Sequence, residues 1–352
     1  MSYKILVFTW TDMISPSSRI RGLYMGKYLS QLGFDVKVFS PKGTERITYF
    51  KKCLYLIEDF LGKIAAVMFS ERKTLIFVQK GLSLLPQLSF IFFIASKFLF
   101  KKRLIYDIDD GLFLKQPFVI NNLIRLSDLV VAGGHELFNY VKKYNKNVIL
   151  IPTSVDLRRY TFNAFRENDH VRLGFIGSLG TTKYLKLLLK PLKELAKSYD
   201  FELRIISSPS YAGYRSFNGL FENFKKGNVK VKLIPWSLQQ EFYQLQNIDI
   251  GLAPLFNGEW EKYKCGFKLI NYMAAGIPPV ASKVGEHCYI IQDGINGFLC
   301  ENEQQWTENL RKLIEDKNLR EKLGIAARKT VEEKYSLERN AKKIAKILAK
   351  YC

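Results

Sequence analysis

Short apolar runs alternate with amphipathic segments of helical length along the whole chain, and this alternation most constrains the fold. Residues 3–9 (YKILVFT) form an apolar run, residues 20–33 (IRGLYMGKYLSQLG) carry apolar side chains at helical spacing, and residues 35–40 (DVKVFS) alternate in hydrophobicity. Gly33 ends the helical segment, as glycine does at many helix C-termini. This order of strand, helix and strand predicts a βαβ unit, and therefore an α/β fold with a parallel sheet.

The pattern begins again in the second half of the chain. Residues 171–180 (VRLGFIGSLG) form a strand that leads into a glycine loop, and residues 185–199 follow with helical periodicity. The length of 352 residues exceeds what one core ordinarily supports. We therefore predict two doubly wound, Rossmann-like domains that face a central cleft, with a linker near residues 157–170 and ligands beyond the carboxyl ends of the strands.

The predicted organisation can be given by residue ranges. Further strands are predicted at residues 74–79, 103–108, 128–133, 147–152, 201–208, 228–236, 249–255 and 278–284. The predicted domains are an N-terminal acceptor domain at residues 1–160, a C-terminal donor domain at residues 168–335, and a C-terminal helix at residues 336–352 that packs back on the N-terminal domain.

The charge of the chain points to an anionic partner. Lysine and arginine number 54 and aspartate and glutamate 33, which gives a formal net charge of +21. A surplus of this size favours nucleic acid, an anionic membrane surface or a phosphorylated substrate. Basic residues are spread over the whole chain without a zinc-finger, RRM, KH or leucine-zipper pattern, so nucleic acid is not the expected partner.

The cysteines and the N-terminus indicate a compartment. The five cysteines are scattered without a CxxC pair, which argues against a disulfide framework or a zinc site and is typical of a reducing cytosol. The N-terminal segment MSYKILVFTW lacks the separate apolar region and small-residue cleavage site of a secretory signal peptide. We expect a cytoplasmic protein.

The most apolar stretch is GLSLLPQLSFIFFIASKFLFKKR, residues 81–103. Proline and polar residues interrupt it, among them Pro86 and Ser89, so the unbroken run is shorter than the ~20 residues that a membrane-spanning helix needs. We expect a buried or interfacial helix, and an interfacial helix would place residues 90–100 at the inner face of the membrane. The basic helix at residues 336–352 has the same two interpretations.

A glycine loop follows the first strand of the second half. In GFIGSLGTTKY, residues 174–184, Gly177 and Gly180 let the backbone approach a ligand closely, and a following helix would present unpaired N–H groups to phosphate. The ammonium of Lys183 is placed to reach a diphosphate. Glycine turns after strands are common, so this loop predicts phosphate binding only together with the next motif.

The second motif is APLFNGEWEKYKCGFKLINYMAAGIPPVAS, residues 253–282. A polar loop with Lys264 and Gly266 leads into the helix FKLINYMAA, whose start again offers an anion site with Lys268 beside it. Asn271 follows Lys268 by three residues and shares its helical face. This spacing predicts one group on a phosphate and the other on a ribose or sugar hydroxyl.

Three acids end a predicted strand at DIDDG, residues 107–111. Alternation places Asp107 and Asp109 on one face, which would suit a divalent cation. Acids at a strand end also cap helices or do polar and catalytic work in a cleft, and these three interpretations stay open here. No HxxxH or HExxH spacing, G-x-S-x-G elbow or Walker loop occurs, so hydrolase and kinase chemistry lack support.

The order of these landmarks resembles that of the retaining glycosyltransferases of family 4, which have the two-domain GT-B architecture. The resemblance covers nearly the whole chain, and its last block is the most specific. The segments that carry it are ILIPTSVD at 149–156, FIGSLGTTK at 175–183, DIGLAPL at 249–255, KLINYMAAGIPPVASKVG at 268–285 and IIQDGINGFL at 290–299. The resemblance implies transfer of a sugar from a nucleoside diphosphate sugar with retention at the anomeric carbon, and with no cofactor or essential metal.

Departures from the family pattern indicate a divergent subgroup with KCGFK and DIDD motifs. The family usually has Arg and then Lys after the glycine loop, where this chain has Ser178 and Lys183. The family also carries two glutamates eight positions apart around the donor helix, and this chain has Tyr263 and Asn271 at those positions. In place of a His-Asp pair at a strand end, the chain has Asp109 followed by a second aspartate.

These features predict a nucleotide-sugar site on the C-terminal domain. Lysines would balance the diphosphate, Asn271 would hold the ribose, Trp236 would flank the base, and Glu259 or Glu261 would replace the carboxylate missing at Tyr263. The predicted donor-binding residues are Gly177, Ser178, Trp236, Lys264, Gly266, Phe267 and Asn271, and the predicted catalytic residues are Asp109, Lys183 and Lys268.

The acceptor is predicted to enter over the N-terminal domain, near Arg19, Arg21 and Asp109. We expect a glycan or lipid-linked acceptor in surface polysaccharide synthesis, and a peripheral association with an anionic membrane. Two alternatives remain. A sugar-nucleotide epimerase with this architecture would need no acceptor, and a non-catalytic protein that binds a polyanion or a membrane surface would explain the two missing glutamates.

Overall fold

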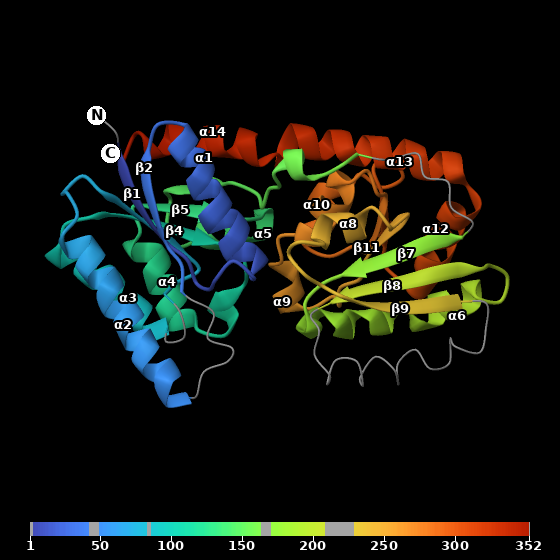
Figure 1. Cartoon of the computed structure of the whole chain (residues 1–352), viewed down its shortest axis with the longest axis horizontal. Coiled ribbons are helices and arrows are strands. Elements are labelled where there is room, and N and C mark those ends of the chain that lie inside the picture. The colour runs from blue at the N-terminus through green and yellow to red at the C-terminus, as the bar shows by residue number, and fades with distance from the viewer. Residues whose placement is uncertain (1–2, 42–48, 83–85, 163–169, 208–228, 352) are drawn as a thin grey trace. The chain divides into compact units, whose positions relative to one another are not determined.

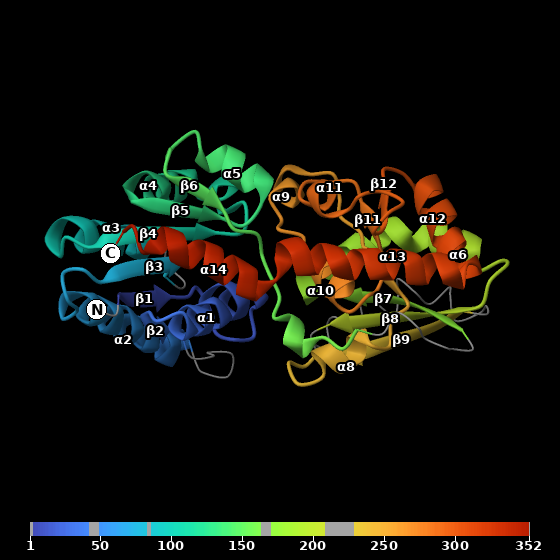
Figure 2. The same ribbon diagram turned by 90° about the horizontal axis from the view of Figure 1, so that it is seen from above.

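The computed structural model describes residues 3–41, 49–82, 86–162, 170–207 and 229–351 (Figures 1 and 2). Parts of the predicted linker, of the predicted strands at 201–208 and 228–236 and of the apolar stretch at 81–103 lie outside these residues. The chain divides into two compact units. Unit 1 comprises Met1–Ser154, Tyr263–Cys265 and Leu337–Cys352, and unit 2 comprises Val155–Lys262 and Gly266–Ser336.

Unit 1 is built on a six-stranded parallel sheet in the order β2-β1-β3-β4-β5-β6. Its strands are β1 (Lys4–Phe8), β2 (Asp35–Phe39), β3 (Leu75–Gln79), β4 (Arg103–Ile108), β5 (Leu129–Ala132) and β6 (Val148–Leu150). Its helices are η1 (Ser18–Tyr24), α1 (Met25–Gln31), α2 (Tyr49–Met68), α3 (Pro86–Ile94), η2 (Ala95–Leu99), η3 (Leu112–Leu114), α4 (Pro117–Leu126), α5 (His135–Val141) and α14 (Leu337–Leu348).

Alternation along each strand of unit 1 builds two separate cores. In β1, Ile5 and Val7 pack with α1 and α14 on one face of the sheet, whereas Leu6 and Phe8 pack with α2 to α5 on the other. Figure 1 shows α1 and α14 above the sheet and α2, α3 and α4 below it. Burial on both faces explains why these strands are apolar almost throughout.

Unit 2 has a second six-stranded parallel sheet in the order β12-β11-β10-β7-β8-β9. Its strands are β7 (Val171–Ile176), β8 (Phe201–Ser207), β9 (Val229–Pro235), β10 (Ile250–Ala253), β11 (Pro279–Ser282) and β12 (Phe298–Cys300). Its helices are η4 (Leu157–Arg159), η5 (Leu179–Leu188), α6 (Leu189–Leu195), α8 (Glu241–Leu245), α9 (Glu259–Lys262), α10 (Phe267–Ala274), α11 (His287–Ile290), α12 (Glu303–Glu315), α13 (Lys317–Thr330) and η7 (Val331–Tyr335).

The sheet of unit 2 is also covered on both faces. Side chains of η5, α6 and α12 bury one face, and side chains of α8, α10 and α13 bury the other. Figure 2 shows α13 running alongside α10, and the two helices are in contact. The predicted α/β class with two doubly wound parallel sheets is therefore confirmed.

The strand orders place a topological switch point in each sheet. In unit 1 the chain leaves β1 toward β2 and then returns to β3 on its other side, and in unit 2 β7 lies between β8 and β10. Connecting helices pass to opposite faces at such a point, which opens a crevice at the carboxyl ends of the two strands. A ligand is therefore expected at the carboxyl ends of β1 and β3 in unit 1, and of β7 and β10 in unit 2.

Several local features differ from the sequence-based expectation. The segment after Gly180 is a 3-10 helix, η5, which becomes α-helical only at Leu189. The helix predicted at 20–33 begins as a π-helix, η1, and ends before Gly33, whose φ of +94° confirms its role at the helix end. None of the helices in the described part of the chain is long and apolar enough to cross a membrane.

Candidate functional site

Two of the residues predicted to bind the donor meet where β7 ends, at the switch point of unit 2. Gly177 follows β7, and Lys268 is the second residue of α10. The Lys268 Nζ lies 3.4 Å from the Thr181 Oγ1 at the start of η5. The structure thus brings together the glycine loop at 174–184 and the helix start at 267–274, which were predicted from separate motifs.

The ammonium of Lys268 is held at this position by its surroundings. Its Nζ lies 3.7 Å from the centre of the Phe175 ring, on the strand that precedes the glycine loop. A cation over an aromatic face within about 6 Å is attracted by the ring quadrupole. Because α10 begins directly after Gly266, which has a left-handed φ of 63°, the positive end of the helix lies in the same place. The arrangement is suited to an anion.

Gly177 is required for the close approach of Lys268. A Cβ at this position would lie 2.4 Å from the Thr181 Oγ1 and 2.8 Å from the Lys268 Nζ. Both distances are shorter than the van der Waals contact of a Cβ atom allows, so any side chain at residue 177 would displace the ammonium of Lys268. At Gly180, in contrast, a Cβ would meet nothing within 4 Å.

Gly177→Ala should therefore weaken donor binding while Gly180→Ala should not. We expect the donor KM to rise roughly tenfold to a hundredfold, the loss of one charge-assisted hydrogen bond, because the displaced groups are flexible side-chain ends. Steady-state kinetics of both variants, with thermal unfolding as a folding control, measures this. Equal KM values for the two variants would contradict the prediction that Lys268 binds the donor beside Gly177.

A buried carboxylate lies in the same unit, close in sequence to Tyr263, where the glycosyltransferases of family 4 that the sequence resembles have a glutamate. The Glu261 Oε1 accepts a hydrogen bond of 2.5 Å from the Tyr184 hydroxyl, and both side chains are buried. Glu259, the other residue named for this role, is exposed on α9. Tyr263 belongs to unit 1, where its ring packs edge-on against Phe113 at 4.8 Å.

Asn271 lies inside unit 2 rather than on its surface. Its Oδ1 accepts a hydrogen bond of 2.5 Å from the Tyr160 hydroxyl, and its side chain is buried. Trp236 follows β9, is half-buried and packs on the same core, as does Phe267. Contacts of these three residues with a ribose or a base remain predictions.

The remaining predicted donor-side residues divide between the units. Lys183 is exposed on η5, with its Nζ 5.1 Å from the centre of the Tyr184 ring. Ser178 is exposed, and its carbonyl oxygen accepts hydrogen bonds from the backbone N–H and the hydroxyl of Thr181. Lys264 is half-buried in unit 1, in the segment Tyr263–Cys265. Within unit 2 the structure brings Gly177 and Lys268 together, and Lys264 belongs to unit 1.

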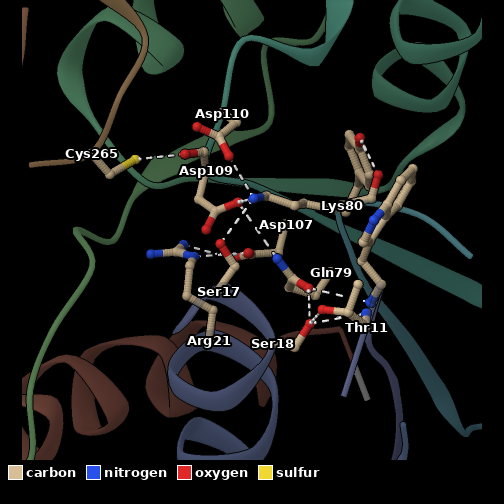
Figure 3. A network of polar contacts seen from close by, with 12 residues as sticks. Thr11, Ser17, Ser18, Arg21, Gln79, Lys80, Asp107, Asp109, Asp110 and Cys265 are labelled. Atoms are coloured by element: carbon tan, nitrogen blue, oxygen red, sulfur yellow. Dashed lines mark hydrogen bonds and ion pairs between the residues drawn. The ribbon is translucent and has the colours of Figure 1, made fainter. Parts of the chain in front are cut away.

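A network of charged groups occupies the switch point of unit 1 (Figure 3). Arg21, on η1, donates two hydrogen bonds to the carboxylate of Asp107 at 2.8 and 2.6 Å and a third to the Ile151 carbonyl at 3.0 Å. The side chains of Arg21 and Asp107 are 4% and 2% exposed. Burial opposes the charge on Arg21, but Asp107 outweighs it and raises the pKa of Arg21 above its ordinary value.

Lys80 joins the two remaining acids of the DIDD motif. Its Nζ lies 3.1 Å from the Asp109 Oδ1, 2.6 Å from the Asp110 Oδ2 and 2.9 Å from the Ser17 Oγ. Burial alone would raise the pKa of Asp109, but Lys80 and Arg21 lower it below its ordinary value, so Asp109 is held ionised. Sequence reasoning missed Lys80; the signal was a lysine at the end of the strand that neighbours DIDD.

Backbone geometry fixes the position of Lys80. Its φ is +63°, in the left-handed region that residues other than glycine rarely adopt, and its carbonyl accepts a hydrogen bond of 2.9 Å from the buried Tyr106 hydroxyl. Strained backbone of this kind persists only where its surroundings hold it, and it clusters at functional sites. The observation supports a functional place for the Lys80–Asp109 pair.

Cys265 anchors the loop that carries Asp109. Its Sγ donates to the Asp109 carbonyl at 3.1 Å. A Cβ at Gly133 would lie 2.8 Å from that sulfur and 3.0 Å from the Asp109 Cβ. Residue 133 must therefore be glycine for this contact to form. The KCGFK motif contributes Cys265 to unit 1 and Gly266 and Lys268 to unit 2.

The three interpretations of DIDD can now be compared. Asp107 and Asp109 are each bound to a basic side chain, and within the described residues no group of three or more His, Cys, Asp or Glu is arranged to hold a metal ion.

Arg19, predicted near the acceptor, is buried and donates to the carbonyls of Met13 and Ile14 at 3.1 and 3.2 Å. Both predicted acceptor arginines thus bond within unit 1, and contact of either with an acceptor remains a prediction.

Comparison with known proteins gives a family match in the second half of the chain. Residues 159–330 match the family model "Glycosyl transferases group 1". N-acetyl-alpha-D-glucosaminyl L-malate synthase of Bacillus anthracis is 23% identical over 238 residues, a match that covers 62% of this chain and 60% of that enzyme. The chain therefore matches about three fifths of the length of this relative.

Two solved structures share the fold over nearly the whole chain. HepE of Anabaena, crystallised in complex with UDP and glucose, superposes with a TM-score of 0.72 at 14% identity and covers 99% of this chain and 100% of its own. Sucrose-phosphate synthase of Thermosynechococcus elongatus superposes with a TM-score of 0.77 at 14% identity, with coverage of 99% and 98%. The chain has the two-domain GT-B fold, and its residues 159–330 are similar to the glycosyltransferase group 1 family.

Proposed function

We propose that this protein transfers a sugar from a nucleoside diphosphate sugar to a glycan or a lipid-linked acceptor, with retention at the anomeric carbon. The observation that carries the proposal is the ammonium of Lys268, held over the Phe175 ring beside the glycine loop at the switch point of a group 1 domain. The complex of Anabaena HepE with UDP and glucose supports a nucleotide sugar as the donor class.

The donor diphosphate would lie at the start of α10. Lys268 would contact it directly, and the exposed ammonium of Lys183 would reach it from η5. When the bond from the sugar C1 to the diphosphate breaks, negative charge grows on the departing phosphate and the sugar becomes oxocarbenium-like. Fixed positive charge at that oxygen lowers the barrier most. Lys268 is therefore proposed as the main catalytic residue of unit 2.

Unit 1 is proposed to receive the acceptor. The acceptor hydroxyl bonds to C1 as the diphosphate leaves, and its proton must pass to a base or to the departing phosphate. Asp109 is held ionised by Lys80 and Arg21 at the carboxyl end of β4, so it can accept a hydrogen bond from a sugar hydroxyl. We propose Asp109 as the catalytic residue on the acceptor side. We also propose that the reaction serves the synthesis of a surface polysaccharide.

One observation favours a second candidate, a non-catalytic protein that binds a polyanion. The position of the family's first glutamate holds Tyr263, whose ring packs into unit 1, and the buried Glu261 already accepts a hydrogen bond from Tyr184. Neither supplies an exposed carboxylate. Turnover separates this candidate from the transferase, because a binder would bind a nucleotide sugar without consuming it.

The proposed function is tested with a panel of UDP, GDP, dTDP and CMP sugars. Thermal shift identifies the nucleotide class that binds, and release of the nucleotide (UDP, GDP, dTDP or CMP) is then measured with and without candidate glycan and lipid-linked acceptors. A transferase releases the nucleotide faster when its acceptor is present. Conversion of the donor to another nucleotide sugar without an acceptor would identify an epimerase, and binding without turnover would identify the binder.

A further inference from the structure

One layer of helices in unit 1 exposes large apolar side chains on its outer surface. The helices α2, α3, η2 and α4 cover one face of the sheet, below it in Figure 1. More than half of the exposed large apolar side chains in the described part of the chain belong to this layer and the short η3 beside it. We call them the docking face: Ile57, Leu61, Met68, Phe69, Ile91, Ile94, Phe98, Leu99, Leu114 and Phe118.

Three of these helices expose apolar side chains on their outer side. Along α3 and η2, Ile91, Ile94 and Phe98 are spaced by three and four residues on the exposed side, while Phe92 and Phe93 are fully buried on the other. On α2, Ile57 and Leu61 are exposed one helical turn apart. A surface helix in water has one apolar stripe that faces the core. A second stripe, repeated on neighbouring helices, marks a surface that another phase or partner covers.

Two of the most exposed apolar side chains of this layer, Phe69 and Leu99, lie next to the end of α2 and at the end of η2. Lys102 is buried, and its Nζ donates to the backbone carbonyls of Ser70 at 2.8 Å and Glu71 at 2.6 Å. These bonds tie the end of α2 to the loop that follows η2. Phe69 and Leu99 are 81% and 71% exposed and flank this junction in the sequence. The two segments therefore present their apolar tips together.

The same junction carries basic side chains beside the apolar ones. Arg72 and Lys73 follow Phe69 by three and four residues, and Lys101 and Arg103 follow Leu99 by two and four residues. All four basic side chains are exposed, and Glu71 is the one exposed acid in these two stretches. Apolar tips bordered by basic groups complement a bilayer with anionic headgroups, because the tips enter the acyl boundary while the cations stay at the phosphates.

We propose that the docking face binds the surface of an anionic phospholipid bilayer. Phe69, Phe98 and Leu99 insert into the interface, and Arg72 and Lys101 contact lipid phosphates. The proposal does not depend on sugar transfer, since none of the residues that it uses belongs to the networks of Lys268 and Asp109 described above. The proposal predicts stronger binding to anionic lipids than to neutral ones, because basic as well as apolar side chains contact the bilayer.

The test is binding of the full chain to vesicles, measured by flotation. Vesicles of equal parts phosphatidylglycerol and phosphatidylcholine are compared with vesicles of phosphatidylcholine alone. The apolar variant carries Phe98→Ser and Leu99→Ser, and the charge variant carries Arg72→Gln and Lys73→Gln. The matched control carries Tyr243→Ser and Ile295→Ser, two side chains of unit 2 that are 64% and 58% exposed.

We expect the wild type and the control to bind the anionic vesicles equally. Both should bind vesicles of phosphatidylcholine alone at least about tenfold more weakly. The apolar variant should lose about tenfold or more in partitioning, and the charge variant should lose binding and salt sensitivity together. Thermal unfolding should be unchanged, because the replaced side chains are exposed.

Three outcomes would overturn the proposal. Wild type that does not float with anionic vesicles at low salt has no such surface, and an apolar variant that binds like wild type excludes the docking face. The third outcome is a wild-type dimer in sedimentation velocity without lipid that becomes a monomer with Phe98→Ser and Leu99→Ser, because a second copy of the chain would then cover this face.

Discussion

Lys268→Ala is expected to lower the turnover of sugar transfer about 100- to 1,000-fold, the usual effect of removing one group that stabilises transition-state charge. The ammonium is half-buried beside Thr181 and over the Phe175 ring, at the start of α10. Its loss would leave the departing diphosphate without its nearest fixed cation. Steady-state kinetics with the identified donor measures the effect.

The fold should survive this change. A cation–ring contact contributes about 0.5–2 kcal/mol, so the unfolding temperature should fall by only a few degrees. Lys190→Ala is the matched control, because Lys190 lies in the same unit but is 78% exposed in an ion pair with Glu303. If Lys268→Ala turns over like Lys190→Ala, the donor site has been assigned to the wrong lysine.

Arg21→Met is expected to destabilise unit 1 by about 3–5 kcal/mol, the usual cost of leaving a buried charge without its partner. Arg21 and Asp107 are almost fully buried and share two hydrogen bonds, so removal of the guanidinium strands the carboxylate. This loss corresponds to a fall of roughly 6–20 °C in the unfolding midpoint of a domain of this size. Thermal unfolding followed by circular dichroism measures it.

The paired variant separates charge from packing. Arg21→Met together with Asp107→Leu removes both charges, and apolar pairs of similar volume are about as stable as buried ion pairs. Most of the lost stability should therefore return, a coupling that a double-mutant cycle resolves. An Arg21→Met variant as stable as wild type would show that the ion pair makes no net contribution to stability, because burial raises the pKa of Asp107 and lets it take up a proton.

The parallel sheets could be predicted from the sequence because their strands are buried on both faces. β3, LIFVQ, is buried at every residue, and such a run between helical segments has few other interpretations. β12, Phe298–Cys300, is not predicted, because only three apolar residues stand between Gly297 and the polar residues after Cys300. The equally short β6 is predicted because it lies in a run of four apolar residues, 148–151. The 3-10 geometry after Gly180 has no clear sequence signal, because the spacing of apolar residues there also suits an α-helix.

The candidate site could be predicted only in part, because its residues meet across neighbouring strands. The pairing of Gly177 with Lys268 follows from two motifs that each end a strand or begin a helix, and order along the chain was enough to suggest it. Lys80 and Asp109 lie 29 positions apart and meet because β3 and β4 pair in register. Sequence patterns give the strands but not the pairs that form beyond their ends.

Asn271 illustrates the opposite limit. Its spacing from Lys268 predicts a shared helical face, yet its Oδ1 accepts a hydrogen bond from Tyr160, which is 111 residues away. A polar residue on an amphipathic helix can serve a ligand or the core, and helical periodicity does not distinguish the two. Calorimetry of Tyr160→Phe with the donor would distinguish them in the folded protein.

The central claim is that unit 2 holds a nucleoside diphosphate sugar at Lys268. Isothermal calorimetry of UDP, GDP, dTDP and CMP sugars against wild type, Lys268→Ala and Lys190→Ala tests it most directly. We predict that one nucleotide class binds wild type and Lys190→Ala equally and binds Lys268→Ala at least about tenfold more weakly, as for the loss of one charge-assisted contact. Equal affinity of all three proteins, or no binding by any nucleotide sugar, would contradict the claim.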